Sequence, residues 1–262
     1  MQNTHTGPDL NTQRPLENQT AIITGAARNL GAHFALGLAA AGANTLIHYN
    51  ADGSGAEAES VAEAAQKFGT KSVAIQTDLT SKDGAKLLFE KAEGVFDKID
   101  ILINNAGAMH KAPIADTSEE DFDRVFALNS KAAFFIMKEA GNKLQDNGRI
   151  INIGTSLLGA FTGYYAAYAG SKAPLEDFSR ALAKEVGNRG ITVNTVCPGP
   201  LETSFLTDAE PQEALDWLAS ASVAGRLGQV EDITPWIVFL ASPGARWATG
   251  QTIFVNGGFA TR

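Results

Sequence analysis

The feature that most constrains the fold is a regular alternation of short apolar runs with longer helical patterns. Most of the runs are continuously apolar, which indicates strands buried on both faces, as in a parallel sheet with helices on each side. The sequence therefore predicts an α/β fold with a doubly wound, seven-stranded, mostly parallel sheet. The predicted strands cover 20–24, 44–49, 71–76, 99–104, 149–154, 191–196 and 251–256, and the predicted helices lie within 31–42 and over 56–69, about 82–96, roughly 119–144 and near 231–241.

The N-terminal segment, the net charge and the single cysteine narrow the class of protein further. The first residues are polar and lack the apolar core of a signal peptide, so we expect a flexible tail over 1–15 and a single domain over 16–262. No stretch approaches the ~20 apolar residues of a membrane span. The net charge of −8 argues against nucleic-acid and anionic-membrane partners. The single cysteine, Cys197, is interpreted as a buried thiol in a reducing compartment, so we expect a cytoplasmic protein, and we expect no metal site.

The segment "TGAARNLG" (24–31) joins the first predicted strand to the first predicted helix. In doubly wound sheets a ligand's pyrophosphate lies at this helix N-terminus, next to a glycine-rich turn. Gly25 would permit the tight turn and Gly31 the close packing of helix on strand. The segment therefore predicts a dinucleotide site, although a purely structural turn is the alternative.

Three tyrosines and a lysine lie in "GYYAAYAGSK" (163–172). Only Tyr168 has a lysine four residues later, and this spacing places Tyr168 and Lys172 on one face of a helix. A free phenol has a pKa near ~10, and a nearby ammonium stabilises the phenolate, so we expect Lys172 to lower the pKa of Tyr168. An ordinary pair on a helix surface is the alternative.

Together these motifs resemble the short-chain dehydrogenase/reductase family, which carries T-G-x-x-x-G-x-G and Y-x-x-x-K. The segments "NNAG" (104–107), "CPGPLET" (197–203) and "VNGG" (255–258) add to the resemblance. It implies a Rossmann-type domain that transfers hydride between a nicotinamide dinucleotide and a carbonyl/alcohol pair. Its other implied catalytic residues are Ser156, chosen because Gly159 follows three residues later, and Asn129. Thr155 is the alternative to Ser156, and for Asn129 the alternative is a buried amide bonded to backbone.

The resemblance also implies the residues that hold the cofactor. Two departures from the family pattern lie close to them. Asn29 replaces a glycine, which an asparagine can do because it tolerates left-handed backbone angles, but its side chain is expected to crowd the phosphates. Pro174 lies inside a presumed helix and predicts a kink. The implied cofactor-binding residues are Gly25, Arg28, Asn29, Leu30, Gly31, Tyr49, Asn50, Ser54, Asp78, Leu79, Asn105, Ala106, Gly107, Tyr168, Lys172, Pro198, Gly199, Leu201 and Thr203. Asp78 could equally cap a helix, and Asn104 could be purely structural.

The choice of dinucleotide depends on the end of the second strand. NAD-dependent relatives place an aspartate where this chain has Tyr49, and Arg28 matches a basic residue that NADP-preferring relatives use for the 2′-phosphate. Asn50 and Ser54 could add neutral hydrogen bonds, whereas Asp52 is a contrary sign. We expect NADP, with NAD possible.

The expected substrate is a neutral carbonyl or alcohol with apolar bulk. The wall of its site is predicted to be largely apolar and aromatic, although these side chains could instead belong to the core or to a subunit contact. His110 could reach the mouth, but an exposed loop histidine is the simpler interpretation. A homo-oligomer, tetramer or dimer, is expected through "KAAFFIMKEA" (131–140). The alternatives to an NADP-dependent enzyme are an NAD-dependent alcohol dehydrogenase and a non-catalytic dinucleotide sensor. The predicted wall residues are Leu157, Leu158, Phe161, Tyr164, Tyr165, Leu201, Phe205 and Trp217.

Overall fold

A computed structural model describes residues 14–160 and 162–261. All seven predicted strands are present, and they form one sheet in the order β3-β2-β1-β4-β5-β6-β7. Every neighbouring pair of strands is parallel, so the predicted α/β fold is confirmed and the sheet is parallel throughout. The strands are β1 (Thr20–Ile23), β2 (Asn44–Tyr49), β3 (Ser72–Gln76), β4 (Ile101–Asn104), β5 (Arg149–Ile153), β6 (Thr192–Pro198) and β7 (Thr252–Val255).

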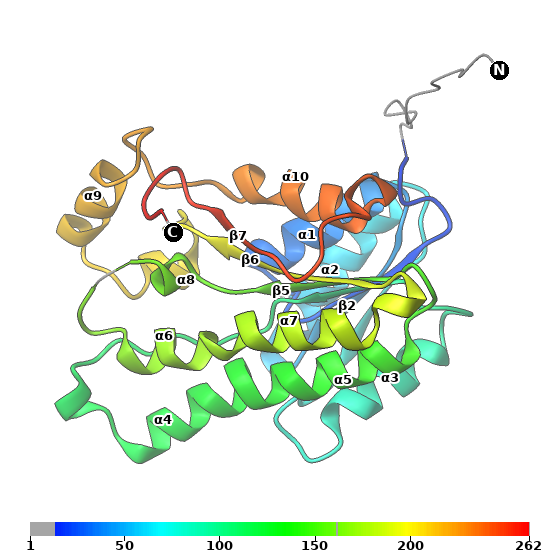
Figure 1. Ribbon diagram of the computed structural model, residues 1–262, viewed down its shortest axis with the longest axis horizontal. Coiled ribbons are helices and arrows are strands. Elements are labelled where there is room, and N and C mark those ends of the chain that lie inside the picture. The colour runs from blue at the N-terminus through cyan, green and yellow to red at the C-terminus, as the bar shows by residue number, and fades with distance from the viewer. Residues whose placement is uncertain (1–13, 161, 262) are drawn as a thin grey trace.

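Helices cover both faces of the sheet (Figure 1). Successive residues of a strand point to opposite faces, and in β1 Ile23 joins one apolar cluster while Ile22 joins the other. One cluster lies under α1 (Asn29–Ala40), α2 (Gly55–Gln66) and α10 (Val230–Ala241). The other lies under α3 (Gly84–Glu93), α5 (Ala133–Lys143) and α7 (Pro174–Glu185). Within the described residues, none of the helices combines the length and the apolar character needed to cross a membrane.

Two of the predicted helices are divided next to the catalytic candidates. The long helix predicted over 119–144 consists of α4 (Glu119–Phe126), a π-helical segment (Ala127–Ala132) and α5. The tyrosine-bearing helix ends as α6 (Ala166–Lys172), and Pro174 opens α7. A proline is tolerated at a first helical position, where its missing N–H would have no partner. The expected kink at Pro174 is therefore a boundary between two helices.

The variable stretch after β6 lies beyond the carboxyl ends of the strands (Figure 1). It contains α8 (Ser204–Thr207) and α9 (Gln212–Ser220), and we call residues 204–222 the flap. Neither of its helices contains a fully buried residue. The remaining short helices are 3-10 turns at Asp52–Ser54, Ile114–Asp116, Ser156–Leu158, Gly187–Arg189 and Pro243–Ala245.

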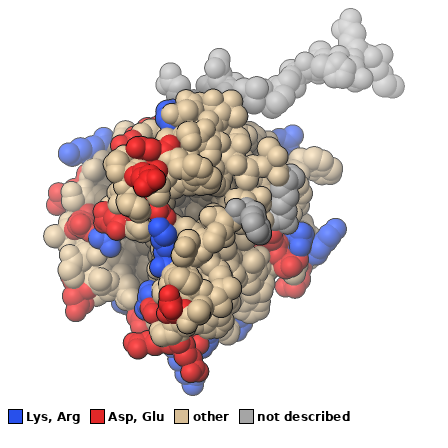
Figure 2. Space-filling model, turned by 90° about the vertical axis from the view of Figure 1, so that its left-hand side faces the viewer, with Lys and Arg blue, Asp and Glu red and all other residues tan. Residues whose placement is uncertain are grey.

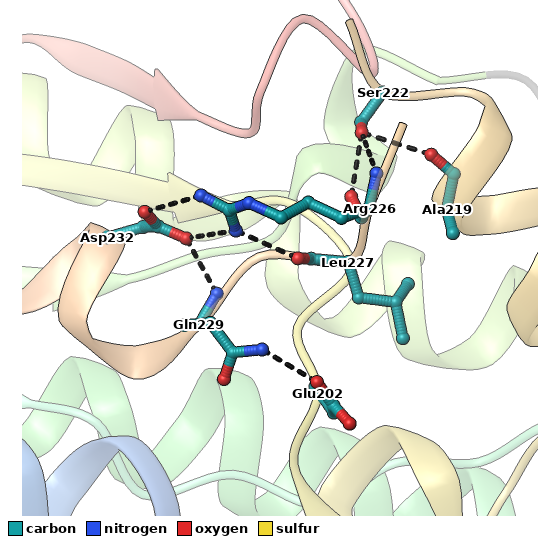
Figure 3. A network of polar contacts seen from close by, with 7 residues as sticks. All are labelled: Glu202, Ala219, Ser222, Arg226, Leu227, Gln229 and Asp232. Carbon is teal, nitrogen blue, oxygen red and sulfur yellow. Dashed lines mark hydrogen bonds and ion pairs between the residues drawn. The ribbon is translucent and has the colours of Figure 1, made fainter. Parts of the chain in front are cut away.

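Polar contacts fasten both ends of the flap to the start of α10 (Figure 3). Glu202, just before the flap, accepts a hydrogen bond from the Gln229 amide at 2.6 Å. At the other end, Ser222 bonds the backbone of Arg226, and the Arg226 guanidinium makes a bidentate pair with Asp232 at 2.7 and 3.0 Å. The Asp232 carboxylate also caps α10 by accepting from the backbone N–H of Gln229. The N-terminus of α10 thus holds the flap at both ends.

A ladder of buried polar side chains crosses the core from β4 to β6. The Asn104 amide donates to Asn152 at 2.8 Å, the Asn152 amide donates to Ser179 at 2.8 Å, and Ser179 bonds Thr195 at 2.8 Å. All four residues are buried. Buried polar groups are tolerated when each one has a partner, so this ladder explains the structural role considered for Asn104.

The ladder predicts that Asn152→Ala lowers the free energy of unfolding by about 2–4 kcal/mol, because it removes one hydrogen bond from the Asn104 amide and one from the Ser179 hydroxyl and opens a small cavity. Urea unfolding followed by far-UV circular dichroism would measure the change. The control is Asn142→Ala on the exposed surface of α5, which should stay within about 0.5 kcal/mol of the wild type. Equal effects of the two substitutions would contradict the role of the ladder.

Candidate active site

A cleft of about 630 Å³ opens at the carboxyl ends of the strands, between the sheet and the flap. The end of the molecule that carries the flap is visibly hollowed (Figure 2). Ligands of doubly wound proteins bind outside this edge of the sheet. The predicted site residues that line the cleft are Gly25, Arg28, Asn29, Leu30, Gly31, Tyr49, Asn50, Ser54, Leu79, Asn105, Ala106, Gly107, Ser156, Tyr168, Lys172, Pro198, Gly199, Leu201 and Thr203.

The glycine turn has the geometry that its sequence predicts. Gly25 has φ +61°, and a side chain at Gly31 would place its Cβ 2.3 Å from the Gly25 carbonyl oxygen. Asn29 has φ +51°, the left-handed conformation expected for an asparagine that replaces a glycine. Its amide exchanges two hydrogen bonds with the Ser204 hydroxyl of the flap, at 3.0 and 3.1 Å. The Asn29 side chain thus joins the turn to the flap, a contact that the sequence analysis did not foresee.

The glycine turn and the "NNAG" segment are held together by hydrogen bonds. The Thr24 hydroxyl accepts from the backbone N–H groups of Asn105 and Ala106, both at 2.9 Å. In return, the Asn105 amide donates to the carbonyl oxygens of Thr24 and Gly25, at 2.9 and 3.1 Å. These contacts fix the ends of β1 and β4 against each other, at the place where the strand order reverses.

His48 also positions the glycine turn, a role that the sequence did not predict. The side chain is buried in β2, where Nδ1 accepts from the backbone N–H of Gly25 at 3.1 Å. Its Nε2 bonds the Thr77 carbonyl oxygen at 2.8 Å and must therefore carry the proton. Burial lowers the pKa of His48 to about 4. The only available signal was a histidine inside an otherwise apolar strand.

Two acidic residues considered for the cofactor site lie outside the cleft lining. Asp78 does not line it; its carboxylate accepts from the backbone N–H and the hydroxyl of Thr80, at 2.9 and 2.7 Å. Asp78 caps no helix either, since α3 begins at Gly84 after Asp83, so its carboxylate closes a local turn at Thr80. Asp52 accepts from the Gln76 amide at 2.7 Å and also lies outside the cleft lining.

Tyr168 and Lys172 are both buried in α6 and line the cleft together. Burial raises the pKa of Tyr168 to about 12, and a hydrogen bond with the Thr155 side chain opposes that rise. The pKa of Tyr168 is therefore raised overall, against the lowering that was expected from Lys172. The Lys172 ammonium donates to the Ile153 carbonyl oxygen at 2.9 Å. Burial lowers the pKa of Lys172 to about 8.

The structure separates the two hydroxyl candidates after β5. Thr155 is the residue whose side chain is hydrogen-bonded to Tyr168. Ser156 also lines the cleft, but its hydroxyl donates to the Cys197 carbonyl oxygen at 3.2 Å. The Thr155 hydroxyl oxygen also accepts from the Leu157 N–H at 3.3 Å, so both hydroxyls have local partners. The contact with the phenol favours Thr155, and the catalytic role of either hydroxyl stays a prediction. Both residues come soon after β5, which ends at Ile153.

Asn129 lies in the π-helical segment and is fully buried. Its amide donates to the Ala108 carbonyl and to the Ser171 hydroxyl, and its oxygen accepts from the Ala108 N–H at 2.9 Å. Asn129 does not line the cleft. A Cβ on Gly107 would lie 3.1 Å from both the Asn129 oxygen and Lys172 Nζ. Gly107 therefore lies directly between these two polar groups, with little room for a side chain.

The predicted substrate wall is present in large part, and it contains a charged cluster that was not predicted. Leu158 and His110 are not among the lining residues, and Phe161 lies outside the described residues. His110 instead bonds Thr117 and faces Asp121 at 3.7 Å. The predicted wall residues that line the cleft are Leu157, Tyr164, Tyr165, Leu201, Phe205 and Trp217, and the unpredicted charged ones are Lys111 and Glu210.

The arrangement can hold an extended ligand along the glycine turn and bring its end to a buried phenol. Comparison with known proteins agrees with this geometry. A family profile described as Enoyl-(Acyl carrier protein) reductase matches residues 25–260. An NADPH-dependent aldehyde reductase-like protein of Arabidopsis thaliana, labelled chloroplastic, is 39% identical over 94% of this chain and 95% of its own length. A hydroxynaphthalene reductase-like protein, Arp2, of Metarhizium brunneum is 37% identical over 95% and 98%.

A solved structure gives the same result. A putative dehydrogenase from Burkholderia cenocepacia with bound NADP has a TM-score of 0.91 and is 44% identical, over 96% of this chain and 97% of that one. The chain belongs to the short-chain dehydrogenase/reductase family, and it is an oxidoreductase of the carbonyl/alcohol class.

The burial of His48 predicts a loss of stability in acid. Because the pKa is about 4 in the folded protein and near 6.5 when unfolded, the unfolded chain binds more protons between these values. The free energy of unfolding should therefore fall as the pH drops from 6.5 to 4, by on the order of 3 kcal/mol. Urea titrations across this range should show a flatter pH dependence for His48→Gln than for the wild type.

The control is His33→Gln on α1, whose side chain is 43% exposed. This variant should keep the slope of the wild type. If His48→Gln keeps that slope as well, the assignment of the acid sensitivity to His48 is wrong.

Proposed function

We propose that the protein is an NADP-dependent reductase of aldehydes or ketones. The observation that carries the proposal is the buried Tyr168 phenol, hydrogen-bonded to Thr155 and placed one helical turn before Lys172, in the cleft that also contains the glycine turn. The relatives named as NADPH-dependent or bound to NADP support the choice of cofactor.

The residues of the cleft fit a dinucleotide with a 2′-phosphate. The first turn of α1 contains no acidic residue, so the partial positive charge of its N-terminus is available to a phosphate. Arg28 lines the same part of the cleft and is exposed. The contrary sign, Asp52, is held outside the cleft lining by Gln76. A cationic and neutral rim at this position favours NADP over NAD.

The proposed reaction divides the work between cofactor and protein. When bound, the reduced nicotinamide supplies the hydride. Tyr168 donates the proton to the oxygen of the substrate, and its raised pKa keeps the phenol protonated at neutral pH. The Thr155 hydroxyl, already bonded to the phenol, is placed to hold that oxygen as charge develops on it. This distribution of protons suits carbonyl reduction better than alcohol oxidation.

Lys172 and Asn129 are proposed to act behind the phenol. With a pKa of about 8, Lys172 is mostly an ammonium at neutral pH, and its charge favours the anionic form of Tyr168 after proton transfer. Asn129 holds the chain after β4 through both polar atoms of its amide. Gly107 belongs to this segment after β4 and lies between Asn129 and Lys172. Holding the segment in place therefore also holds the surroundings of the Lys172 ammonium.

The catalytic assignment predicts that Tyr168→Phe lowers kcat about 10³-fold with little change in the Kd for NADPH, because the phenol supplies the proton but is not needed for binding. Thr155→Ala should lower kcat by about 10²-fold, the cost of removing one group that stabilises the developing oxyanion. The assay is NADPH oxidation with ketones, aldehydes, quinones and keto-steroids, together with an α,β-unsaturated thioester that reports reduction of a carbon–carbon double bond.

Ser156→Ala is the matched control for Thr155→Ala, and it should keep kcat within a few-fold of the wild type because its hydroxyl is bonded to a backbone carbonyl. A greater loss with Ser156→Ala than with Thr155→Ala would return the role to Ser156. If Tyr168→Phe stays fully active, the proposed mechanism is wrong.

The assignment of Arg28 to the 2′-phosphate predicts that Arg28→Ala weakens NADPH binding by about 10- to 100-fold, because a charge-assisted contact with that phosphate is lost. Binding of NADH, which lacks this phosphate, should change by less than about threefold. Fluorescence titration with both nucleotides measures the two constants. The control is Arg246→Ala, which lies outside the cleft lining and should change neither. Equal losses for NADPH and NADH would contradict recognition of the 2′-phosphate by Arg28.

Localisation and assembly stay predictions. The apolar segment proposed for a tetramer lies on α5, where Phe134 and Phe135 are 46% and 44% exposed. Large aromatic side chains on a surface helix are typical of a subunit contact, which supports a homo-oligomer formed through α5. The cytoplasmic location rests on the sequence alone.

A further inference from the structure

The substrate end of the cleft contains one polar cluster on an otherwise apolar and aromatic wall. Glu210, on the flap between α8 and α9, accepts a hydrogen bond from the Tyr165 hydroxyl on one carboxylate oxygen. The other oxygen forms an ion pair with Lys111 Nζ at 2.6 Å. Lys111 Nζ also lies 5.9 Å from the centroid of the Tyr165 ring. These three side chains come from three separate segments, and all of them line the cleft.

Burying the Glu210 carboxylate costs free energy that a role in packing alone does not explain. Its side chain is 4% exposed, compared with 28% for that of Lys111. A buried ion pair is often no more stable than well-packed apolar side chains of similar volume, because both charges lose their hydration. Residues of the flap next to Glu210 are apolar, and another apolar side chain would cover the cleft equally well. This cost is consistent with a role in ligand recognition.

The carboxylate retains capacity for a ligand. An ionised carboxyl group has about four acceptor positions on its two oxygens. Tyr165 and Lys111 take one position on each oxygen. A hydrogen-bond donor that enters the cleft can therefore be accepted by Glu210 without displacing either partner, whereas a second carboxylate there would be repelled.

The position of the cluster sets the size of the substrate. The rings of Tyr165 and Tyr168 lie edge to face with their centroids 6.3 Å apart, and Phe205 lies 6.3 Å from Tyr168 on the flap side. The Tyr165 hydroxyl, at the end of its ring, contacts Glu210. A substrate whose carbonyl lies at Tyr168 must therefore extend by about the size of a ring before it reaches the carboxylate.

We propose that Glu210 is a specificity-determining residue that selects carbonyl compounds with a ring-sized apolar body and a neutral hydroxyl group at the end remote from the carbonyl. The inference rests on the proposed function, because it assumes that the carbonyl binds at Tyr168. The hydroxyl donates a hydrogen bond to the Glu210 carboxylate. Substrates with a carboxylate at that end are rejected by like charge, although Lys111 is close, because the Lys111 ammonium is already paired.

The test compares matched substrates on two frames, benzaldehyde substituted at C4 and 1-tetralone substituted at C6. Each frame carries a hydroxymethyl, a methyl or a carboxyl group. For the wild type, kcat/KM should be about tenfold higher with hydroxymethyl than with methyl on at least one frame, the value of one hydrogen bond to a charged acceptor. The carboxyl compound should be about tenfold worse than the methyl compound.

Three variants separate recognition from structure. Glu210→Gln should reduce the hydroxymethyl preference to threefold or less and remove the penalty on carboxyl, because Lys111 becomes unpaired. Lys111→Met should keep the hydroxymethyl preference and increase the carboxyl penalty, an opposite shift that a loss of folding could not produce. Glu213→Gln removes the same charge from an exposed position on α9, and it should leave both ratios as in the wild type.

Each outcome bears on one hypothesis. Ratios that are the same in Glu210→Gln, Lys111→Met and the wild type would overturn the role of Glu210, while reduction of the methyl compounds would still support the proposed function. If the wild type oxidises NADPH with none of the six compounds, the proposed function itself is overturned. Should Glu210→Gln not fold, the shift in Lys111→Met decides alone.

Discussion

The active site depends on the hydrogen bonds that join the ends of β1 and β4 at the reversal of the strand order. Two parallel strands whose following segments turn to opposite faces leave a crevice between them. The Thr24 hydroxyl and the Asn105 amide bridge that crevice with four hydrogen bonds. Because the glycine turn follows Thr24 directly, these bonds set the position of the α1 N-terminus. His48 holds the same turn from β2, so three strands determine where a phosphate can bind.

Burial, more than charge pairing, determines the protonation of Tyr168 and Lys172, the proposed catalytic pair. Taking a phenol and an ammonium out of water disfavours the charged form of each. The pKa of Tyr168 therefore rises and that of Lys172 falls. The two shifts move the pKa values apart, from 10.0 and 10.5 in the free side chains to about 12 and about 8, so at neutral pH the phenol keeps its proton while Lys172 is mostly an ammonium. The hydrogen bond from Thr155 lowers the pKa of the phenol and so opposes the effect of burial.

Most of the fold could be predicted from the sequence, because apolar runs and helical periodicity are local patterns. The placement of Tyr168 and Lys172 on one helix at the cleft was equally accessible, since it depends only on helical spacing. The choice between Thr155 and Ser156 was not, because one residue of loop length decides which hydroxyl faces the phenol. Asp78 follows a strand in the expected manner and still does not line the cleft, because its carboxylate bonds Thr80. Lys111 and Glu210 are 99 positions apart, and no local pattern marks such a pair.

The flap explains how one fold can serve different substrates. Its ends are fastened to α10, and between them it meets the rest of the cleft through polar contacts of Asn29 with Ser204 and of Lys111 and Tyr165 with Glu210. Its helices bury no residue completely, so changes in it leave no cavity in either apolar cluster. Core substitutions are limited by packing, whereas flap residues are limited mainly by these few contacts. Substrate choice is therefore placed in the segment that the stability of the sheet constrains least.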